Sequence, residues 1–421
     1  MAWHDLRTRA AVLAAILVAA ACQASPTPAP TPRSTVPPTE APTPTATPPP
    51  PLDSIGPGEG ALDLIVRAGY AESGANDGAY DWVTPFEEDT GCEVNAVEIG
   101  SSEQLLATIG QDPPGTWDGV AVSGDASVRL IADGRVHPVD VKGLFPAWND
   151  IWAPLQSPAH NTVDELHYGI SHGWGANVLM WNSTVVEPDP TSWQVAYDPD
   201  SPYKGRLTAY DSAISIADAA VYLAEARPDL EITDPYALDR PQFDAVARLL
   251  EAQRPLVGVY WGTPLDQISA FRDGNAVLGS AWPGQVRLLQ DEDPPVPVKT
   301  VLPLEGTTAW ADSWMLLTGA RHPNCMLRWM AWMVSPQVQK MAAEYGAYAP
   351  ANTTACPLLD EHPGPFGFGD FCSFHHATDE RYKALVRFWK TPLARCGDER
   401  GDVCVDYAFW LQQWDEIKAA D

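Results

Sequence analysis

The sequence predicts an α/β fold in two lobes, and two observations carry this prediction. Strand and helix patterns alternate between residues 61 and 122, and such alternation implies a parallel sheet. The stretch from Gly60 to Asp421 is also longer than one average hydrophobic core supports, which favours two lobes.

Residues 1–22 have the pattern of an export signal. Arg7 and Arg9 precede a short apolar run, Ala10–Ala21, which is too short to span a bilayer. Small residues before Cys22 resemble a bacterial lipoprotein signal, although Ala19 stands where that pattern prefers Leu. An ordinary signal peptide with an incidental cysteine is the alternative. We predict a lipoprotein signal peptide over 1–22 and acylation of Cys22.

A proline-rich stretch follows the signal. Residues 23–52 contain 12 prolines and seven threonines, and they bury too little apolar surface to fold. Proline-rich tethers are extended and semi-rigid. We predict a disordered tether over residues 23–59 that holds a globular part away from a membrane; a glycosylated stalk would have the same mechanical role. No later apolar run is long enough for a transmembrane helix.

The formal net charge of −29 argues against a nucleic-acid partner, which requires a basic face. An acidic cleft attracts cations, so the charge is compatible with a cationic ligand. Acidity that only keeps an exported protein soluble is an equally good explanation.

Without Cys22, six cysteines remain, an even number that indicates disulfides in an exported chain and allows 15 pairings. We favour Cys356–Cys372 and Cys396–Cys404, because each closes a short local loop, and this leaves Cys92–Cys325. No cysteine spacing matches a zinc site, and the adjacent His375 and His376 do not converge easily on one ion. We therefore expect no metal and no cofactor.

The first predicted strands and helices alternate along the chain. They are a strand at 61–67, a helix at 81–90 capped by Gly91, a strand at 92–99, a helix at 102–109 and a strand at 117–122. Ligands in parallel sheets bind in loops at the carboxyl ends of strands. This rule places Tyr70 and the loop Ser123–Asp125 on one rim.

The later elements carry further candidate side chains. They are an apolar pair at 167–171 and 173–181, a turn and strand at 203–211, a helix from Pro241, a strand and loop at 271–284, and helices at 323–333 and 406–419. Two glycines beside Trp174 indicate a hinge or a close approach to a ligand. The strand at 203–211 delivers Asp211 to a loop end, and the loop before residue 284 carries Trp282.

The segment Thr307–Leu316 contains Trp310 and Asp312, two residues apart. Side chains with this spacing point to the same side of an extended strand, so a ring and a carboxylate share one face. A core tryptophan beside a solvated aspartate is the alternative.

The order of these pieces resembles the solute-binding proteins of ABC importers, in the spermidine/putrescine-binding branch. The resemblance covers about residues 62–420. The stretches that carry it are Pro85–Gly91, Trp117–Asp118, Tyr168–Gly175, Thr191–Trp193, Tyr203–Leu207, Phe271–Asn275, Ser280–Gly284 and Trp310–Ser313.

The resemblance implies a periplasmic-binding-protein-like fold of type II, with two lobes joined by crossing strands and a ligand cleft between them. Lobe 1 is expected at 60–172 plus 311–355, and lobe 2 at 173–310 plus 356–421. The expected protein is a monomeric, non-enzymatic receptor. It is anchored to the outer face of the cell membrane or periplasmic, and its partner is a membrane permease.

In polyamine binders of this branch, aromatic rings hold the methylene chain and carboxylates pair with the ammonium ends. The matching aromatic residues are Tyr70, Trp282 and Trp310, and the matching acids are Asp211 and Asp312. Arg67 and Ile214 depart from the pattern, because they stand where the branch has an aromatic residue and a glutamate. Near the end of the third strand, where the branch has a tyrosine, this chain has Asp125, which offers a compensating carboxylate.

Two other functions are compatible with the sequence. The same fold binding a sugar or another small organic solute would use Trp174, Trp282 and Trp310 as stacking platforms. An exported hydrolase is the more distant alternative, because no nucleophile elbow, His-Glu-x-x-His motif or phosphate loop occurs.

Overall fold

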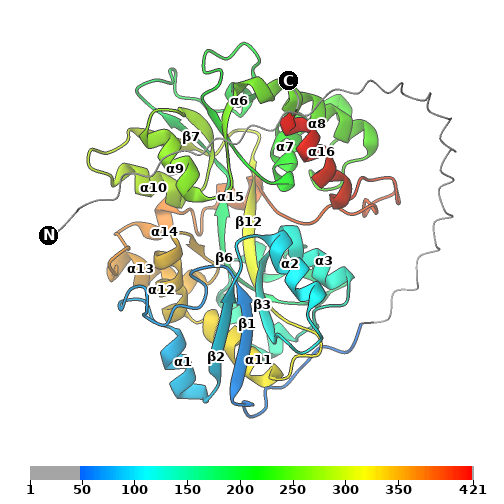
Figure 1. Ribbon diagram of the computed structural model, residues 1–421, viewed down its shortest axis with the longest axis vertical. Coiled ribbons are helices and arrows are strands. Elements are labelled where there is room, and N and C mark those ends of the chain that lie inside the picture. The colour runs from blue at the N-terminus through cyan, green and yellow to red at the C-terminus, as the bar shows by residue number, and fades with distance from the viewer. Residues whose placement is uncertain (1–47, 420–421) are drawn as a thin grey trace, which may run out of the picture. The chain divides into compact units, whose positions relative to one another are not determined.

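The structure is a computed structural model and describes residues 48–419 (Figure 1). The predicted signal peptide, the acylated Cys22 and the first part of the predicted tether lie outside the described residues.

The larger of the two main sheets has seven strands. They are β1 (Ala61–Val66), β2 (Glu93–Glu98), β3 (Gly119–Ser123), β6 (Ile170–Ala176), β12 (Thr307–Leu316), β13 (Ala349–Pro350) and β14 (Val386–Phe388). The order is β13-β6-β12-β3-β1-β2, and β14 pairs with β12. Strand β1 is parallel to both β2 and β3, which confirms the predicted parallel sheet. Strand β12 is antiparallel to β3 and β6.

The second main sheet has five strands in the order β11-β7-β10-β8-β9. They are β7 (Val178–Asn182), β8 (Leu207–Tyr210), β9 (Val257–Trp261), β10 (Leu278–Ala281) and β11 (Val298–Val301). A small hairpin joins β4 (Thr162–Val163) to β5 (Leu166–His167).

Helices cover both main sheets. The α-helices are α1 (Val83–Thr90), α2 (Ser102–Gln111), α3 (Gly124–Ala132), α4 (Val141–Leu144), α5 (Ala153–Gln156), α6 (Gln194–Tyr197), α7 (Ile216–Ala226), α8 (Arg240–Gln253), α9 (Pro264–Arg272), α10 (Pro283–Gln290), α11 (Pro323–Met333), α12 (Pro336–Gly346), α13 (Cys356–Glu361), α14 (Phe371–Phe374), α15 (Glu380–Leu385) and α16 (Tyr407–Ala419). Short 3-10 turns are η1 (Pro146–Asp150), η2 (Ala213–Ser215), η3 (Pro228–Leu230), η4 (Arg254–Leu256) and η5 (Thr353–Ala355).

The two sheets are connected by strands that cross between them. Strand β6 of the larger sheet is separated from β7 of the smaller sheet by the single residue Asn177. Strand β11 leads back through residues 302–306 into β12, and β6 and β12 pair side by side in the middle of the molecule (Figure 1). Both crossings therefore meet at one place.

Local sequence signals account for the ends of several elements. Gly91 ends α1 in the left-handed conformation with φ 69°, as its position predicts. Asp239 and Gln242 form a capping box at the start of α8, and Pro241 lies in its first turn. The extended segment predicted at 307–316 is β12.

One predicted loop is wrong, because α3 begins directly after β3. The residues Ser123–Asp125 were expected in a loop, but Asp125 lies in the first turn of the helix. A Cβ atom on Gly124 would lie 1.7 Å from the Trp389 carbonyl oxygen, so only glycine fits this close approach. The helix start thus packs directly on the chain after β14.

The predicted tether extends too far toward the folded part. Leu52 forms a β-bridge with Val139, and the Gly56 N–H donates to Asn324 Oδ1 at 2.6 Å. Glu59 accepts from the backbone N–H groups of Asn324 and Cys325 at the start of α11. Residues 52–59 are therefore held by specific bonds rather than disordered.

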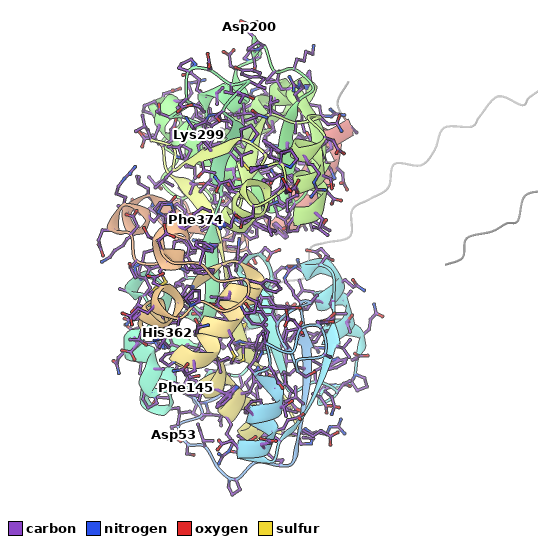
Figure 2. The ribbon with its side chains drawn as sticks, turned by 90° about the vertical axis from the view of Figure 1, so that its left-hand side faces the viewer. Asp53, Phe145, Asp200, Lys299, His362 and Phe374 are labelled. Atoms are coloured by element: carbon purple, nitrogen blue, oxygen red, sulfur yellow. A yellow bond between two sulfur atoms is a disulfide. The ribbon has the colours of Figure 1, made fainter. Side chains whose placement is uncertain are left out.

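The segment between α12 and β14 contacts elements of both sheets. Helix α13 packs on α12, while Arg287 of α10 lies over the ring of Phe368 at 4.3 Å. Phe374 and His362 lie between Phe145 and Lys299 in Figure 2. The boundaries of the two lobes stay a prediction.

The structure contains three disulfides, Cys92–Cys325, Cys356–Cys372 and Cys396–Cys404, which are the three pairs favoured by the sequence. Between residues 48 and 419, no helix is both long and apolar enough to cross a membrane.

The Cys92–Cys325 disulfide joins residues 233 positions apart, whereas Cys396–Cys404 joins residues only eight apart. A crosslink over a longer loop removes more entropy from the unfolded chain. We expect replacement of both Cys92 and Cys325 by Ala to lower the free energy of unfolding by about 2–5 kcal/mol in chemical denaturation.

The double Ala variant of Cys396 and Cys404 is the matched control and should lose clearly less stability. If both variants lost the same free energy of unfolding, the longer loop would not be the reason for the stabilisation by Cys92–Cys325.

Candidate ligand-binding site

Strand β12 presents Trp310 and Asp312 on one face, as their spacing predicts. Asp312 pairs with Ser123 of β3 on one side and with Gly173 of β6 on the other. Trp310 pairs with Gly175 of the same neighbouring strand. The carboxylate is only 3% exposed, while the indole is half-buried.

The two glycines of β6, Gly173 and Gly175, leave room for aromatic rings that pack against that strand. A Cβ atom on Gly173 would lie 2.4 Å from the Tyr348 ring, and one on Gly175 would lie 2.7 Å from Trp310 Nε1. The close approach predicted from these glycines is therefore made by rings of the protein itself.

Trp174, between those glycines, points to the opposite side of the strand. It has no exposed surface and stacks on Trp152 with 4.7 Å between ring centroids. Its ring is covered by protein and offers no platform in this conformation. Trp174 was predicted as a ligand contact, and the structure places it in the core.

Tyr70 lies against Asp312. Its hydroxyl donates to Asp312 Oδ2 at 2.5 Å, and both side chains are buried. Burial, and after it the Asp312 charge, raises the pKa of Tyr70 well above its ordinary value, so the phenol stays neutral and keeps its proton for this bond. The bond leaves Asp312 Oδ1 free of a direct partner among the described side chains.

Asp125 is a second buried carboxylate beside this pair. Burial raises its pKa, and the positive charge of Arg67 works against that rise. Asp125 Oδ1 and Ser123 Oγ are both buried, and within residues 48–419 neither has a hydrogen-bond partner. These atoms have unused bonding capacity next to Asp312.

Arg67 faces these carboxylates. Its Nη2 donates to Ser102 Oγ at 2.8 Å. Burial alone would lower the pKa of Arg67, but the charges of Asp312 and Asp125 outweigh burial and raise it. The side chain that departs from the polyamine-binding pattern therefore lies at the predicted site.

Aromatic rings extend this group of charged and polar side chains to the smaller sheet. Trp282 follows β10. Its ring centroid lies 6.0 Å from that of Trp310 and 5.4 Å from that of Tyr210 on β8. Trp310 in turn lies 5.7 Å from Tyr348. We name the following set the junction cluster: Arg67, Tyr70, Asp125, Tyr210, Trp282, Trp310, Asp312 and Tyr348.

A polar network fixes the orientation of Trp282. Its Nε1 donates to Asn177 Oδ1 at 2.9 Å, and Asn177 Nδ2 donates to Asp218 Oδ1 at 3.1 Å. Thr308 donates to Asp218 and accepts from Trp389 Nε1 at 3.0 Å. The network therefore ties one ring of the junction cluster to both crossing segments.

Asp211 directly follows Tyr210 of the junction cluster, but its carboxylate bonds to helix α16. Its Oδ1 accepts from Lys418 Nζ at 2.6 Å and from Trp414 Nε1 at 3.0 Å, both on α16. Ile214, the other departure from the polyamine-binding pattern, is completely buried in the core of the smaller sheet.

Sequence reasoning missed Tyr348, Tyr210, Asn177 and Asp218. Only Asp218 had a readable signal, because it is a single acid in the first turn of an alanine-rich apolar helix. The others are reached through pairings between distant parts of the chain.

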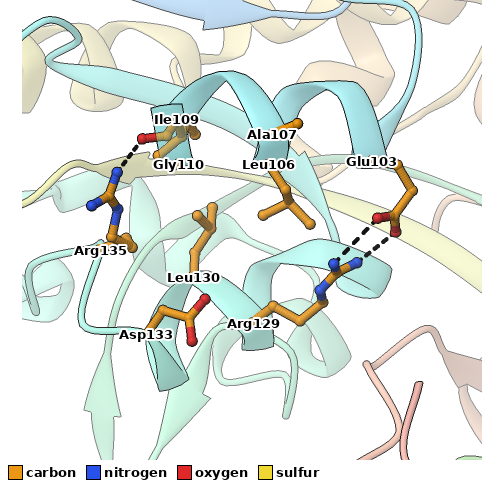
Figure 3. A pocket seen from close by; sticks show the side chains of 9 residues that line it. All are labelled: Glu103, Leu106, Ala107, Ile109, Gly110, Arg129, Leu130, Asp133 and Arg135. Carbon is orange, nitrogen blue, oxygen red and sulfur yellow. Dashed lines mark hydrogen bonds and ion pairs between the residues drawn. The ribbon is translucent and has the colours of Figure 1, made fainter. Parts of the chain in front are cut away.

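A groove outside the junction cluster lies between α2 and α3 (Figure 3). Glu103 accepts from Arg129 at its mouth at 2.5 Å, and the Arg129 guanidinium lies 5.6 Å from the ring centroid of Tyr407 on α16. This cation–π contact joins helices that cover different sheets.

A separate trio, Asp63, Asp118 and His322, has atoms close enough together for a metal ion. However, Asp118 accepts from the backbone N–H groups of Asp63 and His322 at 2.9 Å each, and it lies 2.7 Å from His322 Nδ1. Asp118 therefore ties β1 and the start of α11 to β3.

Asp218 gives folding a specific pH dependence. Burial raises its pKa to about 6, from an ordinary value of 3.8. The folded protein binds this proton more tightly than the unfolded chain does, so the contribution is complete below about pH 4 and is lost as the pH rises through about 6. We expect the stability of Asp218→Asn relative to the parent to increase by about 2 kcal/mol between pH 4 and 7.5.

Denaturation of both proteins across this pH range measures the effect. Asp200→Asn, an exposed residue, serves as the control and should leave the profile unchanged. A constant difference between Asp218→Asn and the parent would contradict a raised pKa.

Comparisons with known proteins are consistent with this geometry. A family model described as a bacterial extracellular solute-binding protein matches residues 81–363. The chain is 26% identical over 309 residues to the spermidine/putrescine-binding periplasmic protein of Escherichia coli, covering 71% of this chain and 84% of that protein.

Solved structures show the same fold. A putative spermidine/putrescine ABC transporter protein from Listeria monocytogenes superposes with a TM-score of 0.66 at 17% identity, over 86% of this chain and 100% of that chain. A lipoprotein of Treponema pallidum superposes with a TM-score of 0.64 at 14% identity, over 85% of this chain and 99% of that chain. The predicted two-lobed fold is confirmed.

Proposed function

Because the chain belongs to the bacterial extracellular solute-binding proteins and is a substrate-binding protein of an ABC transporter rather than an enzyme, we propose that it binds a polyamine-like cation at the junction cluster. Spermidine and putrescine define the chemical class, a linear aliphatic chain with ammonium groups. The relative from Escherichia coli is named as a spermidine/putrescine-binding protein.

The observation that supports this proposal most strongly is that the Asp312 carboxylate lies in the same cluster as several aromatic rings. A linear amine is apolar along its methylene chain and cationic at its ends. Trp310, Trp282 and Tyr348 offer ring surface to the chain, and Asp312 and Asp125 offer carboxylate oxygens to an ammonium. No bond-forming step is needed, only burial of the solute.

Ligand entry requires the two sheets to separate. Asp312 is 3% exposed and Tyr70 is 8% exposed, so a solute reaches them only in a more open conformation. The crossing segments at Asn177 and before β12 are the natural hinge, because the chain changes sheet there. Closure around the solute then provides the state that a membrane permease recognises.

The remaining parts of the proposal concern location and assembly. We propose that acylated Cys22 and a proline-rich tether hold a monomeric receptor at the outer face of the membrane, where it delivers solute to the permease. A sugar or other small organic solute is the second candidate, favoured by the half-buried rings of Trp282 and Trp310.

Calorimetric titration of the full-length protein with putrescine and spermidine tests the proposal. Replacing Asp312 by Asn keeps the shape and removes the charge that pairs with ammonium. We expect affinity to fall at least about 30-fold, because loss of a buried charge partner costs about 2–5 kcal/mol. Raising the salt concentration should also weaken binding to the parent protein, whereas sugar binding should not change.

Asp200→Asn removes the same charge from an exposed loop and should bind like the parent. Unchanged binding in Asp312→Asn would contradict this site, and salt-insensitive binding of a sugar would favour the second candidate.

A further inference from the structure

Arg67 brings a positive charge into the junction cluster. Strand β1 ends just before Arg67, and the Tyr70 N–H donates to the Arg67 carbonyl at 3.2 Å, which closes a tight turn. The same turn therefore presents the Tyr70 phenol to Asp312 and directs the guanidinium to Ser102. Ser102 lies in the first turn of α2, so a hydrogen bond holds the guanidinium to the start of that helix.

The guanidinium acts on groups of both sheets. Burial raises the pKa of Tyr210, on β8, to about 12, and the charge of Arg67 opposes that rise. Asp312 and Asp125 are the main negative charges acting on Arg67. The turn that carries Arg67 also carries Tyr70, whose phenol bonds Asp312, so the positive charge belongs to the part of the molecule where we propose that the solute binds.

The Arg67 guanidinium is not bonded directly to these carboxylates. Among the described residues its side-chain hydrogen bond goes to Ser102, and it forms no direct ion pair with Asp312 or Asp125. Asp125 Oδ1 and Ser123 Oγ are likewise buried without a partner between residues 48 and 419. Among the described residues, Ser102 is therefore the one hydrogen-bond acceptor of the Arg67 side chain, and the nearby Asp125 and Ser123 oxygens are buried without a partner.

The chemistry of these groups restricts the solute. A guanidinium carries five N–H donors and no acceptor, and an ammonium group also carries only donors. The second ammonium of a diamine would therefore meet a like charge at Arg67 and form no hydrogen bond with it. A carboxylate matches the planar guanidinium and accepts two parallel hydrogen bonds from it.

We propose that the solute carries one ammonium group, bound by Asp312 and Asp125, and one carboxylate group, bound by Arg67. This inference rests on the proposed function and narrows it to ω-amino carboxylates with a linear aliphatic chain. Arg67 is then the residue that discriminates against diamines of the same length. The rings of Trp310, Trp282 and Tyr348 still contact the methylene chain, which the two classes share.

Titration of the full-length protein with length-matched pairs tests the inference. The pairs are 4-aminobutanoate with 1,4-diaminobutane, and 6-aminohexanoate with 1,6-diaminohexane. We expect the tighter-binding amino carboxylate to bind the parent protein at least about tenfold more tightly than its matched diamine, since a bidentate charge-assisted pair is replaced by a like-charge contact.

Arg67→Met removes the charge and the donors and keeps an unbranched side chain. It should weaken amino carboxylate binding about 100-fold and strengthen diamine binding, so that the preference reverses. Arg67→Lys keeps the charge without the planar fork and should reduce the preference without reversing it. Arg321→Met is the matched control: its side chain is 65% exposed, and it should keep the parent's preference.

The outcomes separate this inference from the proposed function. Diamines that bind the parent as tightly as amino carboxylates, with affinity lost in Asp312→Asn, would overturn the inference and leave the proposed function standing. An unchanged preference in a folded Arg67→Met protein, verified by its melting temperature, would also overturn the inference. A parent protein that binds no member of either pair, and neither putrescine nor spermidine, would contradict both.

Discussion

The antiparallel pairing of β6 with β12 is the constraint on which the rest of the structure depends. These strands lie side by side where the chain changes from one sheet to the other, and their register places Asp312 opposite Gly173 and Trp310 opposite Gly175. The missing side chains on β6 leave room for the rings of Tyr348 and Trp310. Backbone hydrogen bonds therefore hold Trp310 and Asp312 of the junction cluster at the place where the chain crosses between the sheets.

The junction cluster contains a positive charge as well as carboxylates. The chain as a whole carries a net charge of −29, yet the buried carboxylates Asp125 and Asp312 share their surroundings with Arg67. The neighbouring phenols of Tyr70, Tyr210 and Tyr348 have raised pKa values, chiefly because of burial, and stay neutral. The net charge of the chain therefore says little about which ions this site accepts, because the charges next to the solute decide that.

Much of the fold could be predicted from short-range signals in the sequence. The pairings between residues far apart in the chain could not be predicted in this way. Gly91 and Pro241 each reflect a local backbone preference, the segment Thr307–Leu316 was expected to be extended, and the corresponding elements formed as expected. The glycines beside Trp174 showed that something approaches β6 closely, but a missing side chain does not identify the neighbour. Asp211 illustrates the same limit, since its partner Lys418 lies 207 residues away.

The attachment of residues 52–59 has a mechanical consequence. Glu59 bonds to the start of α11 beside the buried Cys92–Cys325 disulfide, and Leu52 forms a β-bridge with Val139. The attachment lies at the amino end of β1, whereas Arg67 and Tyr70 follow its carboxyl end. A pulling force on the chain before residue 52 would enter the larger sheet near a disulfide rather than through the crossing strands, so it would not load the hinge that we propose there.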